Sequence, residues 1–442
     1  MSLWKIAWRS IQHRSLASGL TAFSMGLGVA LVVAVIVIHG VLDQSFKRSA
    51  QGYDLIVGPK GSSLELVLAT MFYSRPMNDT IAYKWYTELE SGTDWGSDVE
   101  VAIPVALGEH YNGYPVVATT SKFFDKLLYM GTKRYGWDSG RNMDDGSYFE
   151  AVIGYTAAKK NGLGVGDKFK SMHGGPHGGH EHPNEFTIVG VLKPTGTPND
   201  QALFINLEGF FEMHAHEDDS ALGKSLANKN KAGQHISAVL VLTKEEEPQA
   251  TVTVNPLTGI QEGVRASGLA RPVYDPAAMA LPDRINAHPE LQAVHPVVQI
   301  DFLFENIIGN VQLVLIILAV LVIVVAGIGM MVSIYNSMAE RRQEIAIMRA
   351  LGARRITVMA IILLESILLS LGGGVIGMFI GHGLIAVLGP FITEAVKIVV
   401  NPFQFQWAEL ILVPGLIVLA SVVGYLPAVI AYRTDVAQSL AP

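Results

Sequence analysis

The chain has 442 residues, of which 50% are apolar and 16% are charged, a smaller charged share than soluble proteins carry. The formal net charge of -7, without any long basic run, argues against nucleic acid as a partner. The sequence contains no cysteine, which excludes disulfides, thiolate metal sites and cysteine nucleophiles.

Four apolar segments are long enough to cross the roughly 30 Å hydrocarbon core of a membrane as helices. They cover residues 18–40, 311–336, 356–388 and 410–431. The first is too long for the apolar core of a signal peptide and lacks a small-residue cleavage site after it, so we expect an uncleaved anchor. The predicted fold class is an α-helical membrane protein with four transmembrane helices and a large α/β extracytoplasmic domain, residues 41–310, between the first two.

Arginine and lysine decide the predicted orientation, because they gather in cytoplasmic loops. Lys5, Arg9 and Arg14 precede the first apolar segment and five arginines follow the second. The short loop after the third segment holds only Lys397. The parts expected in the cytoplasm are the amphipathic segment 1–17, the loop 337–355 and the tail 432–442, whereas 41–310 and 389–409 are expected in the periplasm. We therefore expect a multi-pass protein of the inner membrane, in contact with lipid.

Mixed patterns within residues 41–310 predict an α/β domain. Apolar runs at 149–154, 186–192 and 235–243 favour strands. Residues 155–161 are typical of a short helix, closed by Gly162. The segment 172–185, rich in glycine, histidine and proline, predicts a mobile loop.

The histidines of this domain suggest a metal site. The candidate ligands are His173, His177, His180 and His182, which fall within ten residues. His214 and His216 form a second pair. Imidazole suits zinc and other divalent transition metals, and a flexible loop can arrange several ligands around one ion. The alternative is a solvated glycine-rich insertion with adventitious metal affinity.

Small residues recur at four-residue spacing in every apolar segment, which allows helix backbones to approach closely. The glycines predicted as packing positions are Gly26, Gly329, Gly373, Gly377, Gly381 and Gly424. Membrane helices are rich in glycine for general reasons too, but four stripes in four segments favour a tightly packed bundle. Glu365 lies within the third segment, where we expect a polar contact between helices. His382 is expected near the outer interface, without a specific role.

Residues 338–355 carry the most informative pattern. They are strong helix formers, and Gly352 can supply the left-handed turn that ends a helix. Ile345, Met348 and Leu351 fall on one face, whereas the charged residues of 340–344 cluster elsewhere. We therefore predict a short amphipathic helix at the cytoplasmic surface. A basic loop required by topology alone would explain the arginines but not the ordered apolar face.

Residues 340–353, Glu-Arg-Arg-Gln-Glu-Ile-Ala-Ile-Met-Arg-Ala-Leu-Gly-Ala, resemble the coupling segment of the MacB/FtsX/LolC-type permeases, the type VII ABC transporters. Segments 152–167, 186–192 and 426–440 resemble further parts of that family. The candidate ATPase-coupling residues are Glu340, Arg341, Arg342, Glu344, Ile345, Met348, Arg349, Leu351 and Gly352.

The resemblance implies that two permease subunits pair, here two copies of the chain, with the first and second spans at the centre. Each copy would dock a separate ABC ATPase, whose groove receives the apolar face of the short helix. Arg341, Glu344 and Arg349 would orient that helix at the rim. ATP binding and hydrolysis would then move the periplasmic domain rather than open a channel. A periplasmic adaptor or lipoprotein is a further candidate partner.

Nucleotide is expected on the ATPase partner. Residues 58–62, Gly-Pro-Lys-Gly-Ser, lack the spacing of the G-x-x-x-x-G-K-[ST] phosphate loop, and the sequence has no other match to it. ATP and magnesium therefore belong to the partner, and no catalysis by this chain is predicted. The predicted function is a permease subunit that exports or extracts a periplasmic or membrane cargo. The alternatives are a mechanical regulator of a periplasmic enzyme and a component of metal or haem efflux.

Overall fold

The computed structural model divides the chain into two compact units. The helical unit comprises Met1–Gln44, Phe304–Ala395 and Val399–Pro442, and the α/β unit comprises Ser45–Leu303 and Val396–Ile398. The residues that the structure describes are 3–50, 52–74, 77, 79–173, 180–215, 234–244, 252–254, 261–263, 276–340, 342–396, 401 and 403–433.

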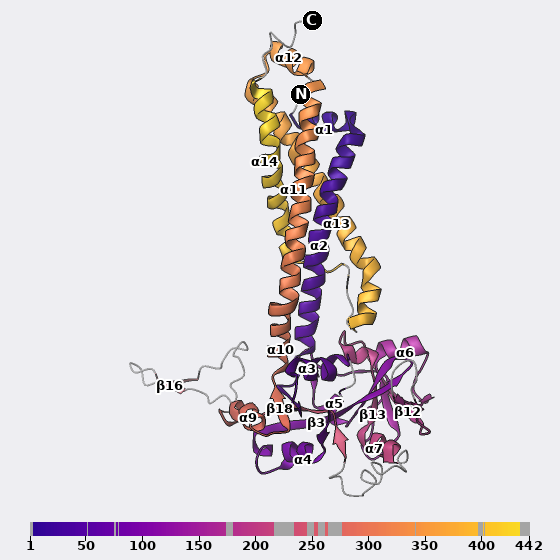
Figure 1. Cartoon of the computed structure of the whole chain (residues 1–442). Helices are drawn as coiled ribbons and strands as arrows, with labels where there is room; N and C mark the ends of the chain where they lie inside the picture. The colour runs from indigo at the N-terminus through magenta and orange to yellow at the C-terminus, as the bar shows by residue number, and fades with distance from the viewer. Residues whose placement is uncertain are drawn as a thin grey trace. The chain divides into compact units, whose positions relative to one another are not determined.

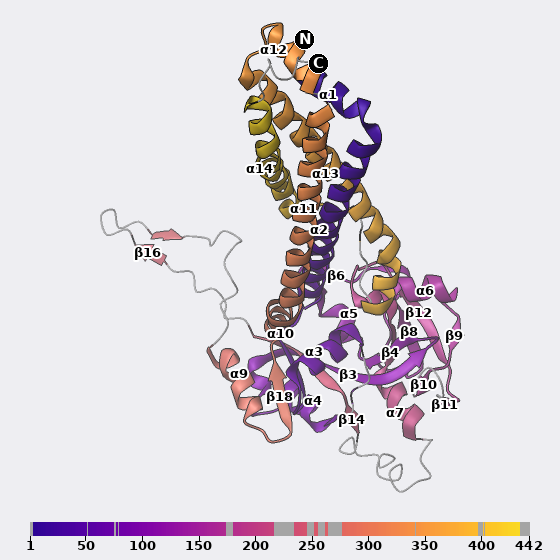
Figure 2. The same ribbon diagram turned by 45° about the horizontal axis from the view of Figure 1, so that its top comes forward.

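Four long apolar helices lie side by side in the helical unit (Figures 1 and 2). They are α2 (Ser15–Ser49), α11 (Gly309–Glu340), α13 (Arg355–Val396) and α14 (Leu412–Arg433). Within the described residues, four apolar helical runs suit a membrane crossing by length and composition, and these helices form them. The first three extend beyond the predicted apolar segments, because backbone hydrogen bonding continues into polar residues at their ends.

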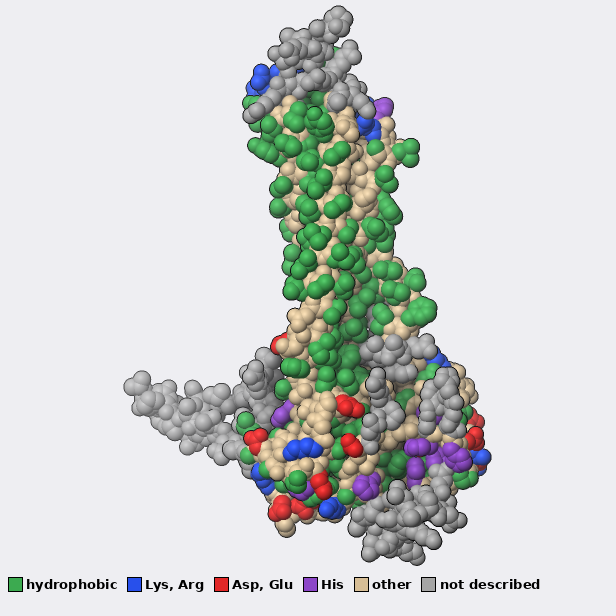
Figure 3. Space-filling model, in the orientation of Figure 1, with side chains coloured by type: hydrophobic (Ala, Val, Ile, Leu, Met, Phe, Trp, Pro, Cys, Tyr) green, Lys and Arg blue, Asp and Glu red, His purple; other side chains and the backbone are tan. Residues whose placement is uncertain are grey.

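Hydrophobic side chains cover the visible outer surface of the helical unit (Figure 3). Leu16 and Phe379, for example, are 90% and 77% exposed. The inner surface is apolar as well, with Met25, Val29 and Val33 of α2 buried against the other helices. A surface that is apolar all round is stable in lipid, since acyl chains solvate such side chains, and it would aggregate in water.

One 12-stranded sheet organises the α/β unit, in the order β18-β1-β15-β3-β4-β13-β8-β12-β7. Its neighbours pair antiparallel except for β4 with β13 and β8 with β12, which are parallel. Three short strands lie off this path: β10 and β11 extend the sheet from β3, and β9 pairs with β12. The strands are β1 (Leu55–Pro59), β3 (Val99–Tyr111), β4 (Tyr114–Thr119), β7 (Trp137–Gly140), β8 (Glu150–Ile153), β9 (Lys168–Phe169), β10 (Met172–His173), β11 (His180–Glu181), β12 (Phe186–Leu192), β13 (Leu203–Asn206), β15 (Ala238–Thr243) and β18 (Leu291–Val294).

Helices cover both faces of the sheet. Figures 1 and 2 show α4 (Lys84–Ser91) and α7 (Leu207–Ala215) on one face and α3 (Ser63–Phe72) on the other. The main core lies under α4 and α7, where Leu89 and Met213 pack with alternate residues of the strands. The period-two alternation of each strand supplies side chains to both faces, which explains why the strands are buried on both sides.

The remaining elements are short. The helices are α1 (Leu3–His13), α5 (Lys122–Asp125), α6 (Tyr155–Asn161), α9 (Pro276–Asn286), α10 (Pro296–Leu303) and α12 (Arg342–Ala350), with 3-10 turns at Gly96–Asp98, Pro198–Gln201 and Trp407–Ile411 and a π turn at Phe304–Ile308. The minor strand pairs are β2 (Ile81–Ala82) with β14 (His235–Ile236), β5 (Leu128–Tyr129) with β6 (Lys133–Arg134), and β16 (Val252–Val254) with β17 (Gln261–Gly263).

Local sequence signals agree with several of these elements. The helix over residues 155–161 is present, and Gly162 ends it at φ +65°. Strands occupy the three predicted runs, although Ser237 separates β14 from β15. The prediction of a mobile loop over 172–185 is wrong for residues 172–173 and 180–181, because β10 and β11 pair with each other and β10 also pairs with β3. Residues 174–179, which include His177, lie outside the described residues.

Candidate functional site

The predicted coupling segment is resolved into two helices. α11 continues to Glu340, and α12 begins at Arg342. At the end of α12, Ala353 N donates to Met348 O and Gly352 N to Arg349 O, both at 3.0 Å. Gly352 itself has φ +103°, so it provides the left-handed residue that lets the chain turn back into α13.

The apolar face of α12 differs from the prediction. Ile345 is buried at 6% exposure and Met348 is partly buried, because both belong to or pack against the apolar cluster that also includes Met338 and Ile362 of the neighbouring spans. Leu351 is 84% exposed and Ile347, which was not singled out, is 47% exposed. The predicted apolar face of Ile345, Met348 and Leu351 thus divides between two environments in the isolated chain, and its docking to an ATPase stays a prediction. Its first two members anchor α12 to its own bundle, and the outward apolar side chains are Ile347 and Leu351.

A small cavity of about 30 Å³ lies beneath α12, inside the helical unit. Its lining includes Ile6 of α1, Ser337 of α11, Met348 of α12 and Glu365 of α13. Glu365 is 7% exposed, so this carboxyl faces the interior of the bundle rather than lipid. The side chains of the charged residues Glu340, Arg341, Arg342 and Glu344 lie outside the described residues, whereas Arg349 is described and half-buried.

Glycines bring α2 and α13 into close contact. A Cβ atom added at Gly377 would lie 2.6 Å from Gly26 O and 2.6 Å from Val29 Cβ. One added at Gly373 or Gly381 would lie 2.8 Å or 2.9 Å from side-chain atoms of α2. These approaches are shorter than side chains allow, so only glycine permits the two backbones to pack at this distance.

The other predicted packing glycines have different environments. Gly26 faces Gly373 and Gly377 within the same chain, so it belongs to the contact between α2 and α13. Gly424 packs against Ser366 of α13. At Gly329 an added Cβ would meet nothing within 4 Å among the described residues. Gly329 therefore does not pack a helix of its own described chain.

His382 has a specific partner that the sequence did not suggest. Its Nε2 lies 3.1 Å from Oε2 of Glu409, which is fully buried. The other carboxylate oxygen of Glu409 accepts a 2.7 Å hydrogen bond from the backbone N of Gln406. The carboxyl group of Glu409 thus joins α13 to the 3-10 turn before α14.

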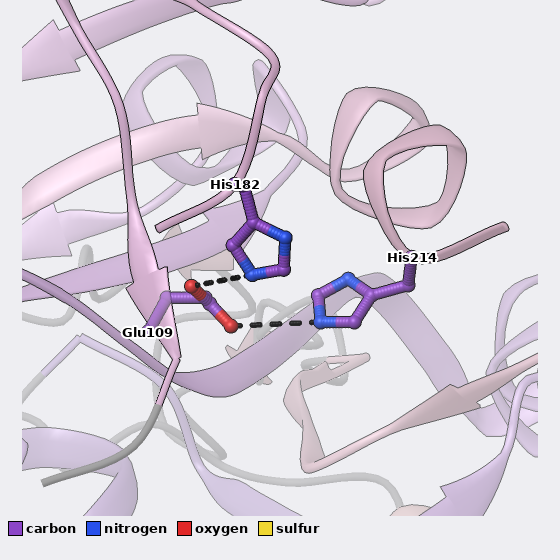
Figure 4. A group of neighbouring side chains, drawn as sticks. All are labelled: Glu109, His182 and His214. Atoms are coloured by element: carbon purple, nitrogen blue, oxygen red, sulfur yellow. Dashed lines mark ion pairs between the residues drawn. The ribbon is translucent and has the colours of Figure 1, made fainter. Parts of the chain in front are cut away.

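A second cluster of functional side chains lies in the α/β unit, around Glu109 (Figure 4). Glu109 comes from β3, His182 follows β11 and His214 lies near the end of α7. His182 Nε2 is 3.2 Å from Oε2 of Glu109, and His214 Nε2 is 3.5 Å from its Oε1. His173 of β10 places Nδ1 2.8 Å from the same Oε1.

The cluster is buried at its centre. The side chains of Glu109 and His182 are 1% and 0% exposed, whereas that of His173 is 62% exposed. Burial alone would raise the pKa of Glu109, but the imidazoles of His182, His214 and His173 outweigh that effect and hold the pKa well below its usual range. The carboxylate is therefore ionised and lies beside three imidazole rings.

Local structure explains how Glu109 reaches this position. Gly108, at φ +131°, precedes it, and the register between β3 and β4 shifts between Ala106 and Glu109. Such a bulge changes the direction in which the following side chain, that of Glu109, points. Of the four predicted metal ligands, the structure brings His173 and His182 to Glu109, while His180 is exposed and His177 lies outside the described residues. Glu109 was not predicted, and His214 was noted only as part of a different pair.

Two family models match the chain. The MacB-like periplasmic core domain matches residues 18–257, more than half of the chain, and the FtsX-like permease C-terminal domain matches residues 316–436. An uncharacterized ABC transporter permease of Methanocaldococcus jannaschii is 23% identical over 367 residues, which cover 79% of this chain and 72% of that protein.

Other relatives match over shorter stretches. The macrolide export ATP-binding/permease protein MacB of Bordetella avium is 33% identical over 145 residues, 31% of this chain and 20% of that protein. The protein of the same name in Chromobacterium violaceum is 41% identical over 83 residues, 19% of this chain and 13% of that protein. The chain thus matches a fifth or less of the length of these MacB proteins. Since the periplasmic core model covers more than half of it and four helices suit a membrane crossing, the chain belongs to the MacB/FtsX-type ABC transporter permeases.

Proposed function

We propose that this chain couples ATP hydrolysis on a separate ATPase to movement of its α/β unit, and thereby exports or extracts a cargo. The two faces of α12 support this most directly. Ile345 and Ala346 are buried among the spans, so a displacement of α12 would be passed to α11 and α13. Ile347 and Leu351 point away from the bundle and would anchor an ATPase.

The charge distribution supports a cytoplasmic position for α12. Arg354 and Arg355 follow it and are exposed, and α1, which carries Lys5 and Arg9, belongs to the same unit. Basic residues of this density favour the cytoplasmic side, where ATP is available. The α/β unit, which contains most of the region matched by the periplasmic core model, would then lie in the periplasm.

Export or extraction of a cargo is favoured over a purely regulatory role by the relatives. Several are named for macrolide export. The proposed cargo of this chain is a periplasmic or membrane-embedded molecule that the α/β unit moves. The packed glycine contacts between α2 and α13 leave no passage along that interface, which suits a mechanical role for the helices.

The docking face can be tested by a double substitution. Replacing Ile347 and Leu351 with Asp removes two apolar anchors, each worth more than about 1 kcal/mol, so ATPase binding should weaken at least about tenfold. Both side chains are substantially exposed, so the permease should keep its own thermal stability. The measurement is recovery of a phosphate-loop ATPase with the tagged permease, together with ATP turnover of the recovered complex.

Ile345→Ala provides the matched comparison on the same helix. It would enlarge the cavity beneath α12 and lower the stability of the permease by about 2–5 kcal/mol, with the outward face unchanged. The purified permease without its partner should hydrolyse no ATP. If the Ile347/Leu351 double variant still recovers an active ATPase in normal yield, α12 is not the docking helix and the proposed coupling fails.

A further inference from the structure

The cluster around Glu109 is built by three elements that are distant in the sequence. Glu109 is held between β4 and β10, since it is opposite Val116 on one side and His173 on the other. His182 is positioned by a 3.0 Å hydrogen bond from its backbone N to Ser171 O. The side chain of Ser171 in turn lies 3.2 Å from Met213 Sδ, which joins the β10–β11 hairpin to α7. The side chains therefore converge within a supported framework.

The hydrogen bonding of His214 determines what its other ring nitrogen can do. Its Nδ1 lies 2.9 Å from the carbonyl oxygen of Phe210, and a carbonyl can only accept, so Nδ1 carries the hydrogen. In the neutral ring, Nε2 then presents a lone pair toward Oε1 of Glu109 at 3.5 Å. Two acceptors at this distance repel each other unless a cation lies between or beside them.

That cation is either a proton on the imidazole or a metal ion. Three imidazoles approach Glu109, and His182 is fully buried beside it. A divalent metal would be bound by the carboxylate together with the imidazole nitrogens of His182 and His214. Hydrogen bonding of the distal ring nitrogen to a backbone carbonyl, as in His214, is also the usual arrangement of a metal-ligating histidine.

The separations of the ligand atoms suit zinc. With bonds of about 2.0–2.1 Å in a tetrahedron, two zinc ligands lie about 3.3 Å apart. His182 Nε2 lies 3.2 Å from Oε2 of Glu109 and His214 Nε2 lies 3.5 Å from its Oε1. With one ligand atom from each of the three residues, all separations are within 4.8 Å, so a modest contraction would close the site around zinc. Nitrogen and carboxylate donors of this kind favour zinc, copper or nickel over calcium and magnesium.

We propose that Glu109, His182 and His214 form a zinc site in the α/β unit. This site differs from the loop site expected from the sequence, because two of its ligands come from β3 and α7. Bound zinc would tie the β10–β11 hairpin and α7 to β3, and would stabilise the α/β unit by an amount that rises with the logarithm of the free zinc concentration above Kd. The proposal does not depend on the role of the chain in ABC transport.

Zinc titration of the full-length chain tests the ligand set. The chain is purified in detergent with a tag that lacks histidine, stripped with a chelator and titrated calorimetrically with zinc chloride. We expect one zinc per chain, with affinity at least about tenfold weaker in Glu109→Gln, His182→Ala and His214→Ala. His180→Ala is the matched control, since this exposed histidine belongs to the same hairpin, and its affinity should be unchanged. If His180→Ala weakens binding while Glu109→Gln and His214→Ala do not, the site is a flexible loop chelate and the proposal is wrong.

A second measurement on the unsubstituted chain keeps the test decisive if a variant fails to fold. X-ray absorption at the zinc edge should show four nitrogen or oxygen ligands near 2.0–2.1 Å. Cobalt in place of zinc should give the intense visible absorption of a tetrahedral site. Six oxygen-rich ligands, or no zinc retained after the free metal is removed, would overturn the proposal, whereas a four-coordinate histidine-containing spectrum supports it.

Discussion

Gly377→Ala is the sharpest test of how the helical unit is packed. The new methyl group would lie 2.6 Å from Gly26 O and 2.6 Å from Val29 Cβ, whereas ordinary van der Waals contact begins at 3.4 Å. The two helices must therefore separate by about 0.8 Å, or α2 must bend. The nearest obstacles are backbone and Cβ atoms, so neither can rotate out of the way as a flexible side chain would.

Overpacking of this size costs about 1–3 kcal/mol. Alanine also stabilises a helix relative to glycine by about 1 kcal/mol, which partly offsets the loss. Gly383→Ala, on an exposed position of the same helix, separates the two effects, because a Cβ there would meet nothing within 4 Å of described atoms. The helix-propensity gain is common to both variants, so the free energy of unfolding should differ between them by about 1–3 kcal/mol.

Thermal unfolding of both variants in the same detergent measures this difference. In soluble domains of about 150–250 residues, 1 kcal/mol shifts Tm by about 2–4 °C, so Gly377→Ala should melt several degrees below Gly383→Ala. Gly373→Ala, with a shortest approach of 2.8 Å, should fall between the two. Equal melting temperatures for Gly377→Ala and Gly383→Ala would refute the close packing of α2 on α13.

Three further results are expected. Gly162→Ala forces alanine into φ +65° at the end of α6 and should cost about 1–2 kcal/mol in chemical denaturation, although nothing crowds the position; a neutral result would contradict the left-handed cap. Arg141→Ala removes a paired contact to Glu150, with N–O distances of 2.9 Å and 2.5 Å, and should cost at most about 1 kcal/mol at pH 7. Because the hydrogen bond from Arg141 lowers the pKa of Glu150, the stabilisation is present above the unfolded pKa of about 4.3 and should vanish as pH falls through the folded value; a loss that persisted below pH 3 would have another origin. Finally, if α11 pairs two copies of the chain, Gly329→Leu should lower the dimer fraction in mass photometry while leaving the melting temperature of the chain unchanged, and an unaltered dimer fraction would place the pairing surface elsewhere.

Several features follow from the sequence because they depend on neighbouring residues only. Four apolar stretches of membrane length predict four helices, since an unpaired backbone cannot lie in hydrocarbon. The helix over residues 155–161 and its glycine end depend on local hydrogen bonds, as does the turn at Gly352. The pattern of residues 340–353 likewise carries the family resemblance without any knowledge of contacts.

The direction in which α12 faces depended on the tertiary structure. Helical periodicity places Ile345, Met348 and Leu351 near one another, but it does not say which flank meets the spans. Packing in the cluster that contains Met338 and Ile362 buries Ile345, whereas Leu351 is exposed. The partner of a helix face is a non-local property, so an apolar stripe alone does not distinguish an anchor to the bundle from a docking surface.

The metal site shows the same distinction. The histidine-rich segment indicated a metal by its composition, but sequence spacing could not connect it to Glu109, which precedes His173 by 64 residues, or to His214, which follows His182 by 32 residues. The pairing of β3 with β10 and the bulge at Gly108 bring Glu109 to His173 and His182, and α7 adds His214. Sheet register and helix placement are fixed by long-range packing and hydrogen bonding. For that reason the sequence could indicate the chemistry of the site, while only the folded chain selected its ligands.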